Sequence, residues 1–450
     1  MRLDGWRTRN LRTLLADDFS GEWGTEPANG QANAAVLRST DLDDGGRVDL
    51  STAARRTIPA SKLVAKRLEP GDILLEASGG GPETPVGRVA LFPGDGDRTY
   101  LCSNFFRTLR PRQSEVDPAF LVRRLQLLYR NPQIQRFQQQ TTGITNLNVH
   151  DYLDVQLTLP GLAEQQRVAE ILDAIDSTID HTDALILKLQ RIKHGLLHDL
   201  VTQGIADDGG LRDAKRHPEQ FRESVIGPIP KEWQIEQLSA ITESAVDGPF
   251  GSNLKSEHYV AEPGVRVIRL QNIGSGHFAD DDRAYVSIAH AGNFLRHQAV
   301  PGDLLVASLG DDNHPFARAC TYPTELDAGI VKADCFRLRM KPARAYNQYV
   351  MHTLNCPATR TQLRGLAQGV TRDRVNLRSL LQFKLRLPPI REQEAIVKAM
   401  RAAEARISAE MAAATKLRKL RQGLLADLLT GRVRAKINTM DPPMTVGSGV

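Results

Sequence analysis

Apolar residues recur at steps of three and four along two stretches of the chain, residues 159–205 and 387–433. This spacing places them on one face of a helix and predicts two amphipathic helices. Each stretch opens on a proline, Pro160 or Pro388, and proline is tolerated in the first turn of a helix but not in its interior. At ~1.5 Å per residue each helix would be roughly 60 Å long. The alternative is two ordinary surface helices, each buried against its own domain.

The two helical stretches are copies of one another. Aligned without a gap, residues 159–202 and 387–430 are identical at 15 of 44 positions, and both open on the pattern Leu-Pro-x-x-x-Glu-Gln. The acidic and amide residues at these openings (Glu164, Gln165, Glu392, Gln393) suit the positive end of a helix dipole, so we expect capping rather than partner binding. Leucines of the apolar stripes are expected at the helix–helix seam and at a subunit-docking surface: Leu189, Leu196, Leu197, Leu417, Leu424 and Leu425.

A glycine also recurs at matched positions near the end of each helix, Gly195 and Gly423. Glycine costs about 1 kcal/mol relative to alanine in a helix interior. Its recurrence predicts a close helix–helix crossing, and tolerance of a frayed helix end is the alternative.

The segments before the helices repeat more weakly. A Pro-Gly-Asp turn followed by an apolar strand occurs at residues 70–76 and again at 301–307. The chain therefore has an α+β fold class, in which two mixed α/β domains are joined by two long antiparallel helices, a coiled coil with an internal pseudo-two-fold repeat. The expected division is a first domain 1–158, a first helix 159–205, a linker 206–226, a second domain 227–386, a second helix 387–433 and a flexible tail 434–450.

Composition adds little to this architecture but excludes some classes. The chain has 450 residues, 41% of them hydrophobic and 25% charged, as expected for a folded protein of more than one domain. It has no apolar run of about 18 residues, and residues 1–10 lack the apolar segment of a secretory leader, so we expect a cytoplasmic protein without membrane contact. The four cysteines lack metal-site spacing. A net charge of +5 weakly favours an anionic partner.

A duplicated unit suits a partner that is itself two-fold related. Duplex DNA is the commonest such partner, because its strands are related by dyads. Two divergent domains on one scaffold would then read two half-sites, and the helices would act as a ruler between them. A duplicated coiled-coil adaptor that joins proteins without touching DNA could share this architecture.

Candidate DNA contacts are chosen by chemistry. Arginine reads guanine, asparagine and glutamine read adenine, and lysine and arginine also bind phosphates. The competing interpretation of each residue is a solvated charge or a polar cap of a turn. Phe250 could insert into a groove of the DNA, and the competing interpretation is a side chain folded back on the core. The candidates are Arg38, Arg88, Asn146, Asn148, Lys255, Arg269, Gln271, Asn272, Arg372 and Arg374.

Motifs of catalysis are weak in this sequence. Asn313-His314-Pro315-Phe316 resembles the Asn-Pro-Pro-aromatic turn of amino-methyltransferases, but histidine replaces the first proline. Gly79–Gly81 lacks the Gly-Lys-Ser/Thr ending of a phosphate-binding loop. We therefore predict no catalytic residues and no metal site.

Several motifs together carry a family resemblance. The paired Leu-Pro-x-x-x-Glu-Gln openings, "ESVIGPIPKEWQIEQL" at 223–238, "VDGPFGSNLKSEHY" at 246–259, "GEWGTEP" at 21–27 and "KLRKLRQGLLADLLTGRV" at 416–433 resemble the specificity (S) subunit of type I restriction–modification enzymes. The resemblance covers nearly the whole chain, in the order variable domain, helix, variable domain, helix. Two departures are Gly161 where the second copy has Pro389, and the differing charges of Ala163 and Arg391.

The resemblance implies a sequence-specific DNA-binding subunit without catalytic activity. Each of its two target-recognition domains would read one half of an asymmetric bipartite site in double-stranded DNA, and the helices would set the spacer. The helices would also dock modification (methyltransferase) subunits, two of them expected, and through these the ATP-dependent restriction subunits. The chain would bind no cofactor, and the complex would use S-adenosylmethionine, ATP and Mg²⁺ on its other subunits.

Overall fold

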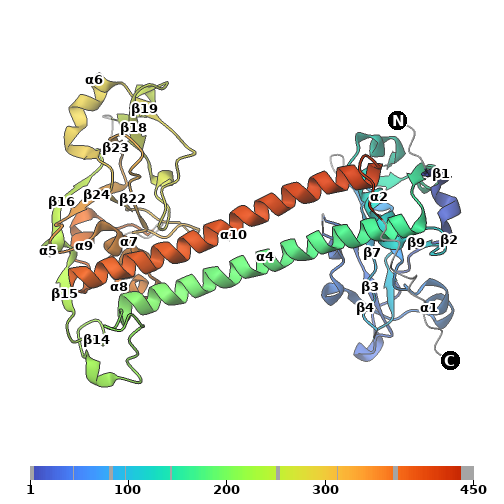
Figure 1. Cartoon of the computed structure of the whole chain (residues 1–450), viewed down its shortest axis with the longest axis horizontal. Helices are drawn as coiled ribbons and strands as arrows, with labels where there is room; N and C mark the ends of the chain where they lie inside the picture. Colours follow the sequence, from blue (N-terminus) through green and yellow to red (C-terminus); the bar gives the residue numbers. More distant parts are fainter. Residues whose placement is uncertain are drawn as a thin grey trace. The chain divides into compact units, whose positions relative to one another are not determined.

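The chain folds into two compact units, each of which contains parts of both long helices. Unit 1 comprises Met1–His181 and Ala414–Val450, and unit 2 comprises Thr182–Ala413. The computed structural model describes residues 5–43, 45–80, 85–96, 98–141, 144–249, 254–311, 313–367 and 373–436. In each unit a head of short strands and helices packs on the start of one long helix and the end of the other (Figure 1).

Both long helices extend without interruption across the division between the units. Helix α4 spans Leu162–Thr202 and helix α10 spans Ile390–Thr430, 41 residues each. Glycines with positive φ follow both ends, Gly204 at +75° and Gly431 at +75°, as in left-handed C-terminal caps. The prediction of a close crossing at Gly195 and Gly423 is wrong, because a Cβ added at either position would meet nothing within 4 Å.

Each unit shows that the helices are antiparallel. In unit 1, Val168 and Leu172 near the start of α4 share a core with Leu428 near the end of α10. In unit 2, Leu200 near the end of α4 shares a core with Ile396 near the start of α10. Of the leucines predicted at the seam, Leu197 is buried at 5% exposure, Leu196, Leu424 and Leu425 are partly buried against these cores, and Leu189 and Leu417 are half-buried.

The head of unit 1 contains a four-stranded antiparallel sheet, β2-β9-β5-β7, and a second sheet, β4-β3-β8, in which β3 and β8 are parallel. Strand β1 pairs with β12 directly before α4, and β10-β11-β6 forms a third sheet. The strands are β1 (Arg7–Asn10), β2 (Leu15–Ser20), β3 (Ala34–Leu37), β4 (Ala54–Arg56), β5 (Ile73–Glu76), β6 (Ser78–Gly80), β7 (Val89–Leu91), β8 (Tyr100–Cys102), β9 (Phe106–Pro111), β10 (Gln138–Thr141), β11 (Ile144–Leu147) and β12 (Gln156–Leu159); the helices are α1 (Ala60–Lys66), α2 (Pro118–Tyr129) and α3 (Val149–Leu153).

The head of unit 2 repeats this plan. Its four-stranded sheet is β16-β24-β21-β22, its second sheet β17-β19-β18-β23-β20 contains the parallel pair β18 and β23, and β15 pairs with β25 directly before α10. The strands are β13 (Phe221–Arg222), β14 (Ile229–Pro230), β15 (Gln234–Gln237), β16 (Thr242–Asp247), β17 (Tyr259–Val260), β18 (Val265–Ile268), β19 (Tyr285–Val286), β20 (Gln298–Ala299), β21 (Leu304–Ala307), β22 (Ala319–Thr321), β23 (Gly329–Val331), β24 (Cys335–Met340) and β25 (Lys384–Leu387); the helices are α5 (Leu238–Ile241), α6 (Ile288–Ala291), α7 (Asn347–Asn355), α8 (Arg360–Arg364) and α9 (Leu377–Leu381).

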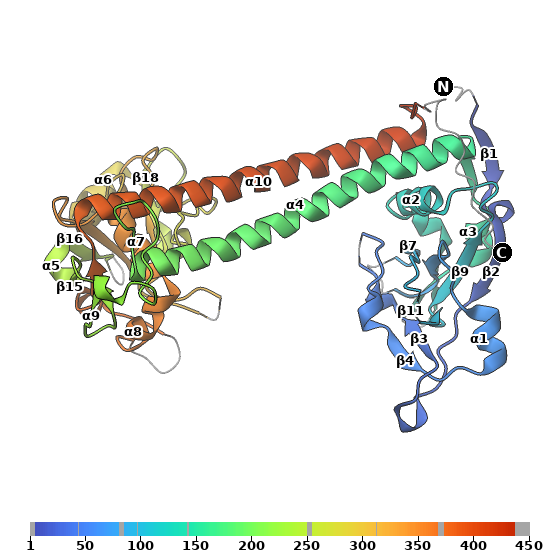
Figure 2. The same ribbon diagram turned by 60° about the horizontal axis from the view of Figure 1, so that its bottom comes forward.

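Each head has an inner part beside the long helices and an outer part away from them. In unit 1, α2 and α3 lie on the inner side, whereas β3, β4 and α1 form the outer part (Figure 2). In unit 2, α7 lies on the inner side, and β18, β23 and α6 form the outer part (Figure 1). Separate hydrophobic clusters fill the outer parts. The predicted fold, mixed helices and sheets with two long helices packed together, is confirmed.

None of the helices in the described part of the chain is long and apolar enough to cross a membrane.

Candidate nucleic-acid interface

The glutamine of each Leu-Pro-x-x-x-Glu-Gln opening fastens a long helix to its head. Gln165 accepts a hydrogen bond from the backbone N–H of Asp117 at 3.0 Å and donates one to the Pro160 carbonyl at 2.9 Å. Gln393 makes the same pair of bonds with Tyr346 at 3.1 Å and with Pro388 at 2.9 Å. Asp117 and Tyr346 are the N-cap residues of α2 and α7. Each glutamine therefore joins the first turns of two helices, and neither is positioned to bind a partner.

The glutamate of each opening binds an arginine that follows the end of the other long helix. Glu164 accepts hydrogen bonds from Arg434 at 2.7 and 2.6 Å. Glu392 pairs with Arg212 and also accepts bonds from Trp233 Nε1 at 2.9 Å and from the Ile205 N–H at 2.8 Å. Each glutamate thus ties the start of one helix to the end of its antiparallel neighbour.

The Pro-Gly-Asp turns supply a third duplicated contact, inside the heads. Asp72 is 1% exposed and accepts two bonds from Arg110, both at 2.8 Å. Asp303 is 2% exposed and accepts two bonds from Arg339, at 2.8 and 2.7 Å. These hydrogen bonds raise the pKa of both arginines above its ordinary value. The two heads therefore share this buried ion pair at the same place in their frameworks.

The loops at the outer ends of the parallel strands share one turn and differ in its residues, Ser39-Thr40 in unit 1 and Leu270-Gln271 in unit 2. Each loop begins with an arginine, Arg38 after β3 and Arg269 after β18, followed by a 3₁₀ turn, η3 (Ser39–Asp41) or η9 (Leu270–Asn272). The backbone N–H of each arginine is capped by the last side chain of its turn, at 2.8 Å in both heads. Asn272 is 0% exposed, and its amide also donates to the carbonyls of Ala279 and Asp282. Because Asn272 is buried and bonded to the backbone, it holds the shape of the loop.

Arg88 and Asn148 also occupy framework positions that are duplicated. Arg88 donates to Glu76 at 2.9 and 2.8 Å and to the Ser39 carbonyl at 3.1 Å, and Arg318 donates to the matching Leu270 carbonyl at 3.0 Å in unit 2. Asn148 caps α3 through the Asp151 N–H at 3.2 Å, as Asn376 caps α9. These side chains hold loops and helix ends in place.

Unit 2 gathers polar and aromatic side chains around the loop that follows β18. Arg269 pairs with the carboxylate of Asp282, and Gln271 donates to the same carboxylate at 2.6 Å. The bond from Gln271, followed by those from Arg269, lowers the pKa of Asp282. Lys332 follows the parallel strand β23 and donates to the Tyr259 hydroxyl at 2.9 Å. We call Tyr259, Arg269, Gln271 and Lys332 the unit-2 face.

The corresponding region of unit 1 carries a different set of side chains. Glu22 accepts a bond from Lys62 at 2.8 Å, which lowers the pKa of the glutamate. Arg56 lies over the Trp23 ring, 4.1 Å from its centroid. Arg38 is 41% exposed and pairs with Asp41 at 2.9 Å. We call Trp23, Arg38, Arg56 and Lys62 the unit-1 face.

In each head a glycine lets its loop approach the backbone directly after the second strand of the parallel pair. A Cβ on Gly21 would lie 2.1 Å from the Ser103 carbonyl oxygen, and one on Gly248 would lie 1.9 Å from that of Lys332. Only glycine fits this approach. These positions explain why the "GEWGTEP" and "VDGPFG" segments both contain glycine at this point.

The remaining candidates lie at the edge of each face or beyond the described residues. Asn146 on β11 accepts a bond from the Ser78 hydroxyl at 2.5 Å. Arg374 occupies the matching position and pairs with Asp334 at 2.7 Å. Lys255 is half exposed and lies 3.3 Å from Glu257. Arg372 and Phe250 lie outside the described residues.

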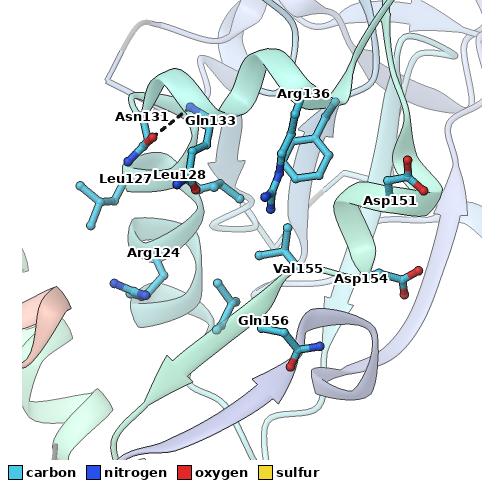
Figure 3. A pocket seen from close by; sticks show the side chains of 12 residues that line it. Arg124, Leu127, Leu128, Asn131, Gln133, Arg136, Asp151, Asp154, Val155 and Gln156 are labelled. Carbon is cyan, nitrogen blue, oxygen red and sulfur yellow. Dashed lines mark hydrogen bonds between the residues drawn. The ribbon is translucent and has the colours of Figure 1, made fainter. Parts of the chain in front are cut away.

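An open groove of about 830 Å³ lies on the inner part of unit 1, between α2, α3 and β12 (Figure 3). Arg124 and Arg136 come from the side of α2 and the following turn η5 (Pro132–Phe137), and Asp151 and Asp154 come from the side of α3. Arg124 donates to the Leu429 carbonyl of α10 at 2.5 Å. The groove and the unit-1 face are therefore built from different elements.

Reactive groups are scarce in the described part of the chain. Cys102 and Cys320 are buried, and burial raises their pKa to about 11 and about 12 respectively, which disfavours a thiolate. Phe316, the aromatic residue of the Asn-His-Pro-Phe segment, is only 4% exposed. Within the described ranges, no three His, Cys, Asp or Glu side chains are grouped as metal ligands.

Known proteins are similar to this chain in sequence. The family model described as "Type I restriction modification DNA specificity domain" matches residues 61–191. The putative type I restriction enzyme MjaX specificity subunit of Methanocaldococcus jannaschii is 24% identical over 437 residues, 96% of this chain and 95% of that protein. The EcoKI specificity subunit of Escherichia coli K12 is 21% identical over 427 residues, 92% of this chain and 85% of its own.

Over nearly its whole length, the chain is similar in sequence to type I restriction–modification specificity subunits.

Solved structures share the fold of this chain. A chain from a structure on complex assembly and conformational transition of the type I restriction–modification system aligns with a TM-score of 0.57 at 17% identity, over 96% of this chain and 99% of the other. The S subunit of the type I system from M. genitalium aligns with a TM-score of 0.52 at 16% identity, over 94% and 96%.

Sequence reasoning missed several residues of the unit-1 face and the unit-2 face. Tyr259 and Lys332 were not among the candidates, because lysine and tyrosine at a strand end are common and carry no signal alone. The signal lies in the topology: Lys332 follows β23, the parallel neighbour of the strand that precedes Arg269. A search of residues that directly follow apolar strands would have found it.

Proposed function

We propose that this chain is the DNA-reading subunit of a type I restriction–modification complex. Each head binds one half of an asymmetric bipartite site, and the two long helices set the spacer between the halves. The observation that carries the proposal is the contrast between the heads. Their buried ion pairs, turns and helix attachments are duplicated, whereas the outer loops differ, as Ser39-Thr40 after Arg38 differs from Leu270-Gln271 after Arg269. A duplicated frame with divergent loops suits two readers of different sequences.

The two faces supply the chemistry of recognition. In unit 2, Gln271 is exposed and can read adenine, whereas Arg269 and Lys332 supply cations for guanine or phosphate. Arg374 and Lys255 extend this face. In unit 1, Arg38, Lys62 and Asn146 are the corresponding candidates. Arg88, Asn148 and Asn272 serve by shaping the loops.

The long helices offer two matched places to dock modification subunits. Ile192 on α4 and Leu420 on α10 are 53% and 54% exposed, and they occupy equivalent positions of the repeat. Exposed apolar side chains at repeated positions suit two copies of one partner. We propose that two modification subunits dock here and bring the restriction subunits with them. S-adenosylmethionine, ATP and Mg²⁺ would then be bound by those subunits, and this chain would be non-catalytic.

Substitution of the unit-2 face is expected to weaken DNA binding by the complex of this chain with its modification subunits. Lys332→Ala would remove one phosphate contact, so the slope of log affinity against log salt should fall by about 1. Gln271→Ala would instead relax base preference at one position by about 1–3 kcal/mol and leave the slope unchanged.

Gel-shift titration across a salt series would measure both effects. The matched control is Lys384→Ala, an exposed lysine on β25 at the inner side of the same head. An equal loss in the control would mean that the unit-2 face is not the contact. Absence of DNA binding by the whole complex would favour the adaptor function instead.

A further inference from the structure

Three elements of unit 1 meet at the carboxylate of Asp176. Asp176 on α4 pairs with Arg421 on α10 and with Arg123 on α2, the latter at 3.2 Å. Arg123 also donates to Asp173 at 2.5 Å. The Asp176 and Arg421 side chains are 20% and 26% exposed, and that of Arg123 is 10% exposed. The head, its own long helix and the neighbouring long helix therefore share one ionic contact.

In unit 2 an ion pair of different residues joins the two long helices at the equivalent positions. Glu404 on α10 accepts a bond from Lys193 on α4 at 3.0 Å. Glu404 and Lys193 are the exact repeat equivalents of Asp176 and Arg421 in the ungapped helix alignment. His352 on α7 is 4% exposed and has Glu404, Lys193 and Arg401 as its charged neighbours. Burial lowers the pKa of His352 to about 4, so this third member is neutral at pH 7.

The apolar side chains of α10 near these contacts do little to fix the register of the two long helices. Between Met400 and Leu417 the large apolar side chains are Ile407 and Met411, and Met411 is 52% exposed. Most of the other apolar residues in this stretch are alanines. Small, repeated side chains pack almost as well after a shift of one turn, so they do not select one alignment of the helices.

A shift of one turn would place each carboxylate against a leucine. On α10 the residues four positions from Arg421 are Leu417 and Leu425, and on α4 those four positions from Lys193 are Leu189 and Leu197. A half-buried carboxylate facing leucine loses its cation and its solvation together. The shifted registers are therefore penalised at two places by the same pattern.

We propose that Asp176 and Glu404 lock the register of the antiparallel helices and so act as spacer determinants. The spacer part of this inference rests on the proposed function, in which the helices set the distance between half-sites. The lock itself is a property of the helix pair and can be measured without DNA.

The neutral His352 makes unit 2 the better place to test the lock. Lys193→Glu or Glu404→Lys alone would place like charges side by side and favour a shifted register. The double variant restores an ion pair of opposite polarity, and His352 opposes neither sign. Spin labels at Gln190 and Ser408, both exposed in unit 2, would report the register in the full chain. We expect each single variant to slide the two helices past one another by about 5 Å, one helical turn, which moves or broadens the label distance, and the double variant to restore it.

Unit 1 provides the internal contrast. The double variant Asp176→Lys with Arg421→Glu also reverses an ion pair, but Arg123 would then face a cation. We therefore expect no rescue there unless Arg123 is also changed to Gln. The matched controls are Arg191→Glu and Glu394→Lys, charge reversals at exposed positions of the same two helices.

The outcomes separate the lock from the spacer function. A label distance that stays unchanged in both single variants, with helical content preserved by circular dichroism, would overturn the lock, as would failure of the unit-2 double variant to restore it. Methylation mapping of the same variants with modification subunits tests the second step. A changed label distance with an unchanged spacer would leave the lock in place and contradict the spacer function.

Discussion

Insertion of seven residues into both long helices is expected to lengthen the spacer of the DNA site by about three base pairs. Seven residues add roughly 10 Å at ~1.5 Å per residue, and B-DNA rises ~3.4 Å per base pair. Seven residues also complete almost two helical turns, so the apolar faces stay aligned to within ~20°. The insertion sites are the junctions between the units, after His181 in α4 and after Ala413 in α10. The half-site sequences should not change.

Methylation mapping in cells that carry the matching modification subunits would measure the spacer. The control is the same insertion in α4 alone. An insertion in α4 alone would keep the helix contacts within unit 2 only if the two helices slid past one another. We therefore expect loss of modification rather than a longer spacer. An unchanged spacer in the paired insertion would show that the helices are not the ruler.

Removal of the Glu392 carboxylate is expected to destabilise unit 2 by about 3–5 kcal/mol, the typical cost of leaving one partner of a buried ion pair behind. The side chains of Glu392 and Arg212 are only 11% and 10% exposed. Glu392→Ala would leave the Arg212 guanidinium, the Trp233 Nε1–H and the Ile205 N–H without their shared acceptor. The equivalent change in unit 1, Glu164→Ala, should cost less, because Arg434 is 47% exposed and can be solvated.

Urea unfolding followed by the fluorescence of Trp233 would measure this loss, in a background with Trp6→Phe and Trp23→Phe. Glu394→Ala, an exposed glutamate in the same helical turn, is the matched control. If Glu392→Ala shifted the unfolding midpoint no more than the control, the carboxylate would not be a structural anchor.

The long helices could be predicted from sequence because their signal is local and repeated. The spacing of apolar residues, the proline at each start and the glycine at each end all act within a few residues. Because the helix is duplicated, a second copy supports each assignment. The sequence did not predict how much of each apolar stripe is buried. Ile192 and Leu420 belong to the same period as Leu196 and Leu424, yet they are more than half exposed. Periodicity gives the face of a helix but not what covers it.

The roles of the polar motif residues could not be predicted in the same way. The Glu and Gln of the helix openings were singled out, but their partners come from other segments, such as Asp117 for Gln165 and Arg212 for Glu392. Arg38 and Arg88 look alike in sequence and both pair with a buried carboxylate, Asp41 or Glu76, yet the Arg38 side chain is 41% exposed and that of Arg88 is 22% exposed. How much of a paired cation stays exposed depends on the tertiary fold. Internal repetition helps here, because a contact present in both heads is a framework contact.

We propose that each head reads its own half-site independently. Replacing residues 1–158 with the corresponding head of a similar specificity subunit, and mapping methylation in cells that supply the modification subunits, tests this proposal. We predict a bipartite motif in which one half changes while the other half and the spacer remain. A motif in which both halves change, or a single continuous motif for the original chain, would contradict the claim.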